Sequence, residues 1–212
     1  MGYMQPVSGK EPIRLFKSDF LEFFTHIHPL VVLAIWLPVA VYFMVRAIME
    51  RPRAASPVYI PVAFIVGLFT WTLAEYVVHR FVFHFPPRTP WQERVSFLFH
   101  GVHHAQPWSK TRLVMPPAVS IPMALLFYGL FSLLVGLVLG APQWVAPLFS
   151  GFVAGYLTYD MLHYSMHHFR MQWGVLRSRR KYHMLHHGST PNRRFGVTSS
   201  LWDIVFGTKP AD

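Results

Sequence analysis

The stretch from Leu113 to Tyr159 constrains the fold more than any other feature, because none of its 47 residues (113–159) is Asp, Glu, Lys or Arg. As one helix it would be roughly 70 Å long, about twice the ~30 Å hydrocarbon core of a bilayer. The stretch is therefore predicted to cross a membrane twice. Gly and Pro separate its two apolar halves at residues 140–143, which places the turn there.

Two further apolar runs precede this stretch. Residues 29–45 are closed by Arg46, and residues 54–74 are closed by Glu75. We therefore expect an all-α, four-transmembrane-helix integral membrane protein with spans at about 30–49, 57–78, 116–139 and 143–162. A composition that is 53% hydrophobic and only 13% charged agrees with this fold class and argues against a soluble domain.

Four spans would place segments 1–28, 79–115 and 163–212 on the same side of the membrane. These segments carry sixteen of the nineteen Lys and Arg residues, so the positive-inside rule predicts that this side is cytoplasmic. The exceptions are Arg46, Arg51 and Arg53 in the first connection. We expect the last two segments to form a cytoplasmic helical cap.

The arm formed by residues 1–28 carries phenylalanines at helical spacing. This pattern predicts a short amphipathic helix that lies in the membrane interface or, equally, one that faces a protein core. The residues concerned are Phe16, Phe20, Phe23 and Phe24.

Eleven of the thirteen histidines fall into four compact groups on the predicted cytoplasmic side. Spacings of three and four place two imidazoles on one helix face, whereas the second His of an adjacent pair is turned by about 100° and reaches a different ion. Ten or so imidazoles are too many for one ion, so two ions side by side are predicted. The groups are His79 and His84; His100, His103 and His104; His163, His167 and His168; and His183, His186 and His187.

The remaining pair, His26 and His28, has i, i+2 spacing, which points the two rings apart on a helix. We interpret this pair as interfacial histidines rather than ligands.

The absence of cysteine removes thiolate ligands, and imidazoles without carboxylates suit Zn, Cu, Fe or Ni rather than Mg or Ca. A redox-silent pair of ions would indicate hydrolysis or structure. A site under apolar helices faces substrates that are mostly C–H bonds, whose cleavage needs activated oxygen, so iron is the expected metal. A non-catalytic metal-binding or transport protein is the alternative of a different class, although a transporter would place its ligands near the bilayer midplane.

Several strings resemble the fatty acid hydroxylase superfamily, most closely its fatty acid 2-hydroxylase branch. They are EYVVHRFVFH (75–84), FHGVHHAQP (99–107), RLVMPP (112–117), YDMLHYSMHH (159–168), KYHMLHH (181–187) and RFGVTSSLWDIVFGT (194–208). The resemblance implies one membrane domain over residues 1–212 that inserts an atom of O2 at the carbon next to a fatty acyl carboxyl or amide. A carotenoid or sterol oxidase of the same superfamily is the alternative, which RLVMPP and the 194–208 string disfavour.

The resemblance also implies a ligand set. It leaves His168 outside the set, beside the motif, and it allows zinc as an alternative to iron. Ten positions match the metal-binding histidines of the family: His79, His84, His100, His103, His104, His163, His167, His183, His186 and His187.

Three acids near the motifs are candidates to accept a hydrogen bond from the N–H groups of metal-bound imidazoles: Glu75, Asp160 and Asp203. His168 is a candidate hydrogen-bond donor that likewise lies beside the ligands without binding a metal. Glu75 precedes His79 by four residues, and Asp160 precedes His163 by three. Ion pairing to a basic residue is the alternative role for Glu75 and Asp160.

The expected partners are a lipid substrate and membrane lipid, and not nucleic acid. Many relatives carry a fused haem domain of the cytochrome b5 kind, whereas about 28 residues precede the first span here and no glycine-rich dinucleotide fingerprint follows a strand. We therefore expect a separate electron donor, a cytochrome b5-like or ferredoxin-like protein with its reductase. A bacterial inner membrane is favoured over the endoplasmic reticulum.

A basic run beside the fourth histidine group suits an acidic electron carrier or, equally, anionic lipid. The run consists of Arg177, Arg179, Arg180 and Lys181.

Overall fold

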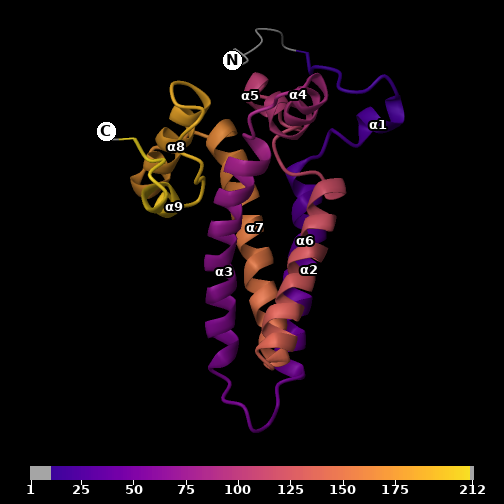
Figure 1. Cartoon of the computed structure of the whole chain (residues 1–212), viewed down its shortest axis with the longest axis vertical. Helices are drawn as coiled ribbons and strands as arrows, with labels where there is room; N and C mark the ends of the chain where they lie inside the picture. Colours follow the sequence, from indigo (N-terminus) through magenta and orange to yellow (C-terminus); the bar gives the residue numbers. More distant parts are fainter. Residues whose placement is uncertain (1–10, 211–212) are drawn as a thin grey trace. The chain divides into compact units, whose positions relative to one another are not determined.

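The computed structural model describes residues 11–210, and every regular element in this part of the chain is a helix (Figure 1). Two compact units are present. The histidine unit comprises the residues up to Pro29, Leu73–Val114 and the residues from Tyr159 onward, and the bundle unit comprises Leu30–Thr72 and Met115–Thr158. The all-helical prediction is confirmed for the described residues.

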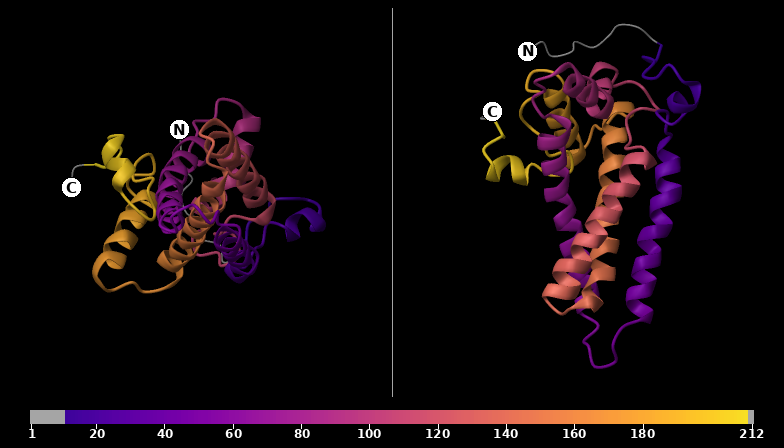
Figure 2. Two further views of the ribbon diagram at one scale, coloured as in Figure 1. Left: turned by 90° about the horizontal axis from the view of Figure 1, so that it is seen from below. Right: turned by 45° about the vertical axis from the view of Figure 1, so that its right-hand side comes forward.

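The bundle unit is built from long helices that lie side by side (Figures 1 and 2). The chain leaves helix after Val138, and Gly140 adopts a φ of 62°, a left-handed conformation that glycine tolerates best. The predicted turn at 140–143 is therefore present. The helices are α2 (Pro29–Met49), α3 (Tyr59–Val77), α6 (Pro117–Phe131) with its π-helical continuation η3 (Ser132–Val138), and α7 (Val145–His168) after the 3-10 turn η4 (Pro142–Trp144). Helix α3 continues into the π-helical η1 (Val78–Phe83), which belongs to the histidine unit.

Within residues 11–210, three helices are long and apolar enough to cross a membrane: Pro29–Met49, Tyr59–Phe83 and Pro117–Val138. These match three of the four predicted spans. The fourth predicted span, 143–162, forms α7, which does not reach the same hydropathy and is therefore not supported on this criterion. The sequence had predicted this span because both apolar halves of the 113–159 stretch lack charged residues.

Helix α7 has lower hydropathy because it is surrounded by the other helices of the bundle. The Ser150 hydroxyl donates to the Ala40 carbonyl of α2 at 2.7 Å. The Phe152 ring lies 5.1 Å from Trp71 of α3 and 4.6 Å from Phe127 of α6, between ring centroids. A helix that is covered by protein can carry Gly, Ser and Tyr, since it does not have to dissolve in lipid.

The backbones of α3 and α7 touch where glycines face each other. A Cβ atom on Gly67 would lie 2.1 Å from the Leu148 carbonyl oxygen, and one on Gly151 would lie 2.0 Å from the Phe64 carbonyl oxygen. Small residues are what allow helices to approach this closely. The close packing of α3 against α7 therefore depends on both glycines.

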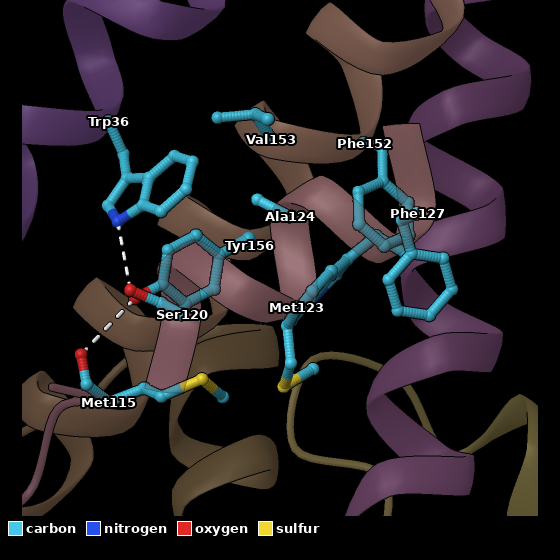
Figure 3. Close-up of a pocket in the computed structure, with 10 residues that line it drawn as sticks. Trp36, Met115, Ser120, Met123, Ala124, Phe127, Phe152, Val153 and Tyr156 are labelled. Atoms are coloured by element: carbon cyan, nitrogen blue, oxygen red, sulfur yellow. Dashed lines mark hydrogen bonds between the residues drawn. The ribbon is translucent and has the colours of Figure 1, made fainter. Parts of the chain in front are cut away.

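Within the bundle unit, Trp36, Ser120 and Tyr156 line an apolar pocket (Figure 3). The Trp36 indole donates to the Ser120 hydroxyl at 3.2 Å, and the Tyr156 hydroxyl donates to the Met115 carbonyl at 3.5 Å. The pocket holds about 20 Å³, which is close to the space of one water molecule. The helices are thus closely packed at this level.

The histidine unit consists of short helices together with the ends of α3 and α7. Helix α4 begins after Thr89, whose hydroxyl accepts from the Gln92 N–H, with Pro90 in its first turn. The further elements are α1 (Asp19–Phe23), α4 (Pro90–Ser96), the π-helical η2 (Phe97–Gly101), α5 (Val102–Ala105), α8 (Gly174–His187) and α9 (Leu201–Val205).

Three of the four phenylalanines in the described part of the arm, Phe20, Phe23 and Phe24, are exposed. Phe20 and Phe23 are 71% and 73% exposed, which rules out the core-facing alternative. The arm is fastened by Glu22, whose carboxylate accepts from the Phe16 N–H and pairs with the buried Arg112. The predicted interfacial position stays a prediction, and residues 1–10 of the arm lie outside the described residues.

Candidate metal centre

Two groups of five imidazoles converge within the histidine unit. In each group the nitrogen atoms that could bind a metal all lie within 4.8 Å of one another. The first histidine group is His79, His84, His100, His104 and His186, and the second histidine group is His103, His163, His167, His183 and His187. The structure therefore brings together all ten positions that the resemblance singled out, and it divides them equally.

Helical spacing explains how the residues are divided. His100 and His104 are four residues apart and share the first group, whereas His103 belongs to the second. Likewise, the neighbours His186 and His187 belong to different groups. A turn of about 100° between adjacent residues predicts this separation. The prediction was wrong for the spacing of three, because His100 and His103, and likewise His183 and His186, belong to different groups.

His79 and His84 are brought together by a π-helical turn. On an α-helix, residues five apart would point roughly 140° away from each other. In η1 the His84 N–H donates to the His79 carbonyl at 3.1 Å, an i to i+5 bond, and the two ring centroids lie 5.0 Å apart. Single π-helical turns are frequent at functional sites. Another π-helical turn, η2, carries His100, which also belongs to the first histidine group. The unusual spacing of five was the sequence signal for this turn.

The Nε2 atoms in each group are spaced as ligands of one ion would be. In the first group, His79 and His104 each place Nε2 at 3.1 Å from Nε2 of His100. In the second group, the corresponding neighbour distances are 2.9 to 3.1 Å. Two nitrogens bound at about 2.1 Å with a 90° angle are about 3.0 Å apart, against about 3.4 Å in a tetrahedron. The donor set thus fits two transition-metal ions with more than four ligands each.

The imidazoles of both groups are held neutral. Burial, followed by the repulsion of neighbouring imidazoles, lowers the pKa of His100, His103 and His183 well below the usual value. Burial also lowers the pKa of His186 to about 4. A neutral imidazole keeps one nitrogen lone pair free, so these side chains can bind a metal at neutral pH without first releasing a proton.

Two backbone carbonyls orient histidines of the first group. Nδ1 of His79 lies 2.5 Å from the Phe195 oxygen, and Nδ1 of His186 lies 2.7 Å from the Arg193 oxygen. Because a carbonyl only accepts, Nδ1 must carry the proton and Nε2 keeps its lone pair. Sequence reasoning missed the Phe195 and Arg193 carbonyls, because a main-chain carbonyl has no side-chain signature.

The predicted contact of Glu75 with His79 is not formed. The Glu75 carboxylate instead accepts from the Val197 and Thr198 N–H groups at 2.5 and 2.9 Å. His79 uses Phe195 in its place. The four-residue spacing had placed Glu75 on the correct helix face, but it could not reveal the chain segment that comes between.

Asp160 and Asp203 are both buried. Nδ1 of His163 has no hydrogen-bond partner among the described residues, so the predicted contact with Asp160 is absent. The Asp203 carboxylate accepts from the Phe195 and Gly196 N–H groups at 2.8 Å each.

The other three histidines, His26, His28 and His168, lie outside the two groups. The His168 ring packs on Tyr164 at 4.4 Å between centroids, and it belongs to neither group. Nδ1 of His26 lies 2.8 Å from the Thr111 hydroxyl.

Residues 64–208 match the family model for fatty acid hydroxylases. The chain belongs to the fatty acid hydroxylase family. Its membrane helices and paired histidine groups are therefore features of a hydroxylase. The resemblance seen in the motifs is confirmed.

Relatives of this hydroxylase include named 2-hydroxylases. It is 39% identical to a dihydroceramide fatty acyl 2-hydroxylase of Arabidopsis thaliana over 206 residues, covering 97% of this chain and 84% of the plant protein. It is 34% identical to the fatty acid 2-hydroxylase of Rattus norvegicus, covering 96% of this chain and 58% of the rat protein. A solved structure of full-length scs7p, with only the hydroxylase domain visible, matches with a TM-score of 0.82 at 38% identity, covering 91% of this chain and 70% of that one.

These relatives come from a plant and a mammal, and the predicted bacterial host stays a prediction.

Proposed function

We propose that this hydroxylase adds a hydroxyl group at the carbon next to the carboxyl or amide of a fatty acyl chain, in a fatty acid or a ceramide-type lipid. The pair of five-imidazole groups carries the proposal, together with the names of the relatives. The overall reaction converts the C–H bond, O2, two electrons and two protons into C–OH and water. Two metal centres close together suit such a two-electron oxidation.

The ten histidines of the two groups are the proposed metal ligands. Iron is the proposed metal of the active enzyme, because the bound ions have to change oxidation state to activate O2, which zinc does not do. The protein presents Nε2 lone pairs at fixed spacing and keeps water away through the burial of residues such as His79, His103 and His183. Held in this way, the donors need little rearrangement when ions bind.

We also propose that α7 is a fourth span and that residues 1–212 form one domain. The 24 residues of α7 would extend about 36 Å, which is enough to cross the hydrocarbon core. An even number of spans puts both histidine-bearing segments on one side, and the distribution of Lys and Arg favours the cytoplasmic side.

The two electrons are proposed to come from a separate protein that docks on a basic groove of about 750 Å³ in the histidine unit. Arg177, Arg180 and Lys181 line this groove, and Trp173, 82% exposed, lies at its side. Positive charge steers an acidic carrier toward such a surface. Arg177→Glu should slow reduction of the enzyme by the carrier, most strongly at low salt, whereas Arg53→Glu in the α2–α3 connection should not. Unchanged reduction together with weaker binding to anionic vesicles would assign the groove to lipid instead.

The test of the function is direct. The chain is expressed with a reductase system, and extracted lipids are analysed by mass spectrometry for 2-hydroxyacyl chains. His103→Ala and His183→Ala should abolish the product, and His26→Ala, outside both groups, should retain it. Wild-type protein that carries two ions and receives electrons but forms no 2-hydroxyacyl product would refute the proposal, and oxygen found instead on a carotenoid or sterol would replace it.

A further inference from the structure

The two histidine groups differ in what holds their outward-facing nitrogens. In the first group, the Nδ1 atoms of His79 and His186 bond to main-chain carbonyls. In the second group, four Nδ1 atoms are buried with no hydrogen-bond partner among the described residues. They belong to His103, His163, His183 and His187.

Both carbonyls lie on one short segment, residues 193–198, which we call the carbonyl clamp. The clamp is held from two sides. Asp203 of α9 accepts from the Phe195 and Gly196 N–H groups. Glu75 of α3 accepts from the Val197 and Thr198 N–H groups and from the Thr198 hydroxyl. Two buried carboxylates therefore fix four consecutive backbone positions.

The clamp has little freedom to adapt. Arg194 adopts a φ of 62°, a left-handed conformation that is uncommon for residues other than glycine, and its N–H donates to the Thr208 carbonyl at 3.2 Å. A Cβ on Gly196 would lie 1.9 Å from the Ser199 carbonyl oxygen and 3.0 Å from Oδ2 of Asp203. No side chain fits at position 196 without moving the segment.

The α9 side of the clamp is itself anchored. The Thr208 hydroxyl donates to Oδ1 of Asp203 at 2.7 Å and lies 3.0 Å from the Tyr76 hydroxyl. Tyr76 follows Glu75 on α3, and Arg80 donates to the Tyr76 hydroxyl at 2.7 Å. The two carboxylates thus belong to one connected network.

We propose that the carbonyl clamp makes the two metal sites unequal: the first histidine group holds its ion more tightly, and the second group releases its ion first. Glu75 and Asp203 are positioning residues in this arrangement, since they act through the clamp and touch no ligand. The inference rests on the ligand assignment of the proposed function, but not on the reaction.

The physical reason is that a hydrogen bond made by Nδ1 of an imidazole changes how strongly Nε2 of the same ring binds a metal. A hydrogen bond from Nδ1–H to a carbonyl fixes the tautomer and the ring orientation and makes Nε2 a better donor, and the loss of such a partner typically weakens metal binding 10- to 100-fold. The first group has two such bonds. Four second-group ligands would instead bury an N–H without an acceptor, a condition that favours release of the ion.

The experiment measures metal retention. The full chain in detergent is loaded with two zinc ions, mixed with excess EDTA, and desalted at intervals for metal analysis. We expect one ion to leave at least 10-fold faster than the other. His104→Ala, which removes a first-group ligand, should leave mainly fast-released zinc, and His167→Ala, which removes a second-group ligand, should leave mainly slowly released zinc. Release of both ions at one rate, or slow release assigned to the second group, would overturn the proposal.

Clamp variants test the cause. Asp203→Asn turns an NH2 group toward one backbone N–H, and Gly196→Ala displaces the segment, so each should speed the slow phase 10- to 100-fold and leave the fast phase unchanged. Glu75→Gln keeps an oxygen for both N–H donors and should change little, as should Glu93→Gln on the exposed surface of α4. An unchanged slow phase in both perturbing variants, or equal acceleration of both phases, would contradict the role of the clamp.

These outcomes are separate from those of the lipid assay. A chain with two unequal ions and no 2-hydroxyacyl product would refute the proposed reaction alone, and a hydroxylase whose ions leave together would refute the clamp alone.

Discussion

The close contact between α3 and α7 predicts that adding one methyl group at Gly151 lowers the stability of the protein. In Gly151→Ala the new Cβ would lie 2.0 Å from the Phe64 carbonyl oxygen, against at least 3.4 Å in an ordinary contact, so the helices must separate by about 1.4 Å. Overpacking typically costs about 1–3 kcal/mol, and the upper end applies here because the obstructing atom is backbone. For a chain of this length, about 3 kcal/mol corresponds to a loss of roughly 6–12 °C in Tm.

The matched control is Gly129→Ala in α6, where no heavy atom from another described part of the chain lies within 4 Å of the new Cβ. Removing a helical glycine there should stabilise the protein by about 0.4–1 kcal/mol, because the unfolded chain loses freedom. The two variants are compared by thermal unfolding in detergent, followed by the loss of the monodisperse size-exclusion peak. Equal Tm values for the two variants, or a lower Tm for Gly129→Ala than for Gly151→Ala, would refute the packing argument.

Three further outcomes are expected. His168→Ala should retain two ions per chain in metal analysis, since His168 lies outside both groups, and the loss of an ion would add it to the ligands. Removing both ions with a chelator should lower Tm by roughly 16–32 °C, because each of two ligands at a thousand times its Kd contributes about 4 kcal/mol, and an unchanged Tm would argue against ions in these groups. Arg112→Ala should speed proteolytic cleavage within residues 11–26, because it removes the partner of Glu22 and of the Ile13 carbonyl, and mass spectrometry of the fragments would reveal an arm that stays protected.

Much of the histidine arrangement could be predicted because helical geometry leaves little choice. Once residues 100–104 and 183–187 are helical, the i, i+4 pairs must share a side and the adjacent residues must diverge. The pair His79 and His84 lies outside this rule, because its spacing of five needs a π-helical turn that the periodicity of an ordinary helix does not provide.

The acids show where sequence reasoning ends. Spacing placed Glu75 on the same face as His79, but the choice between an imidazole and the Val197 N–H depends on a segment more than 100 residues away. The same limit applies to α7. The absence of charge predicted a membrane span, but no local pattern indicated that Gly151 and Ser150 serve contacts with neighbouring helices.

Adjacent residues that serve different groups have a consequence for how the centre tolerates movement. His103 and His104, and again His186 and His187, tie the two groups together through single peptide bonds, and the rings of His104 and His187 stack at 4.1 Å. A shift of α5 or α8 therefore carries a donor of each group along with it. The spacing between the two histidine groups is therefore set by the backbone geometry of adjacent residues, and it stays nearly constant when α5 or α8 moves as a whole.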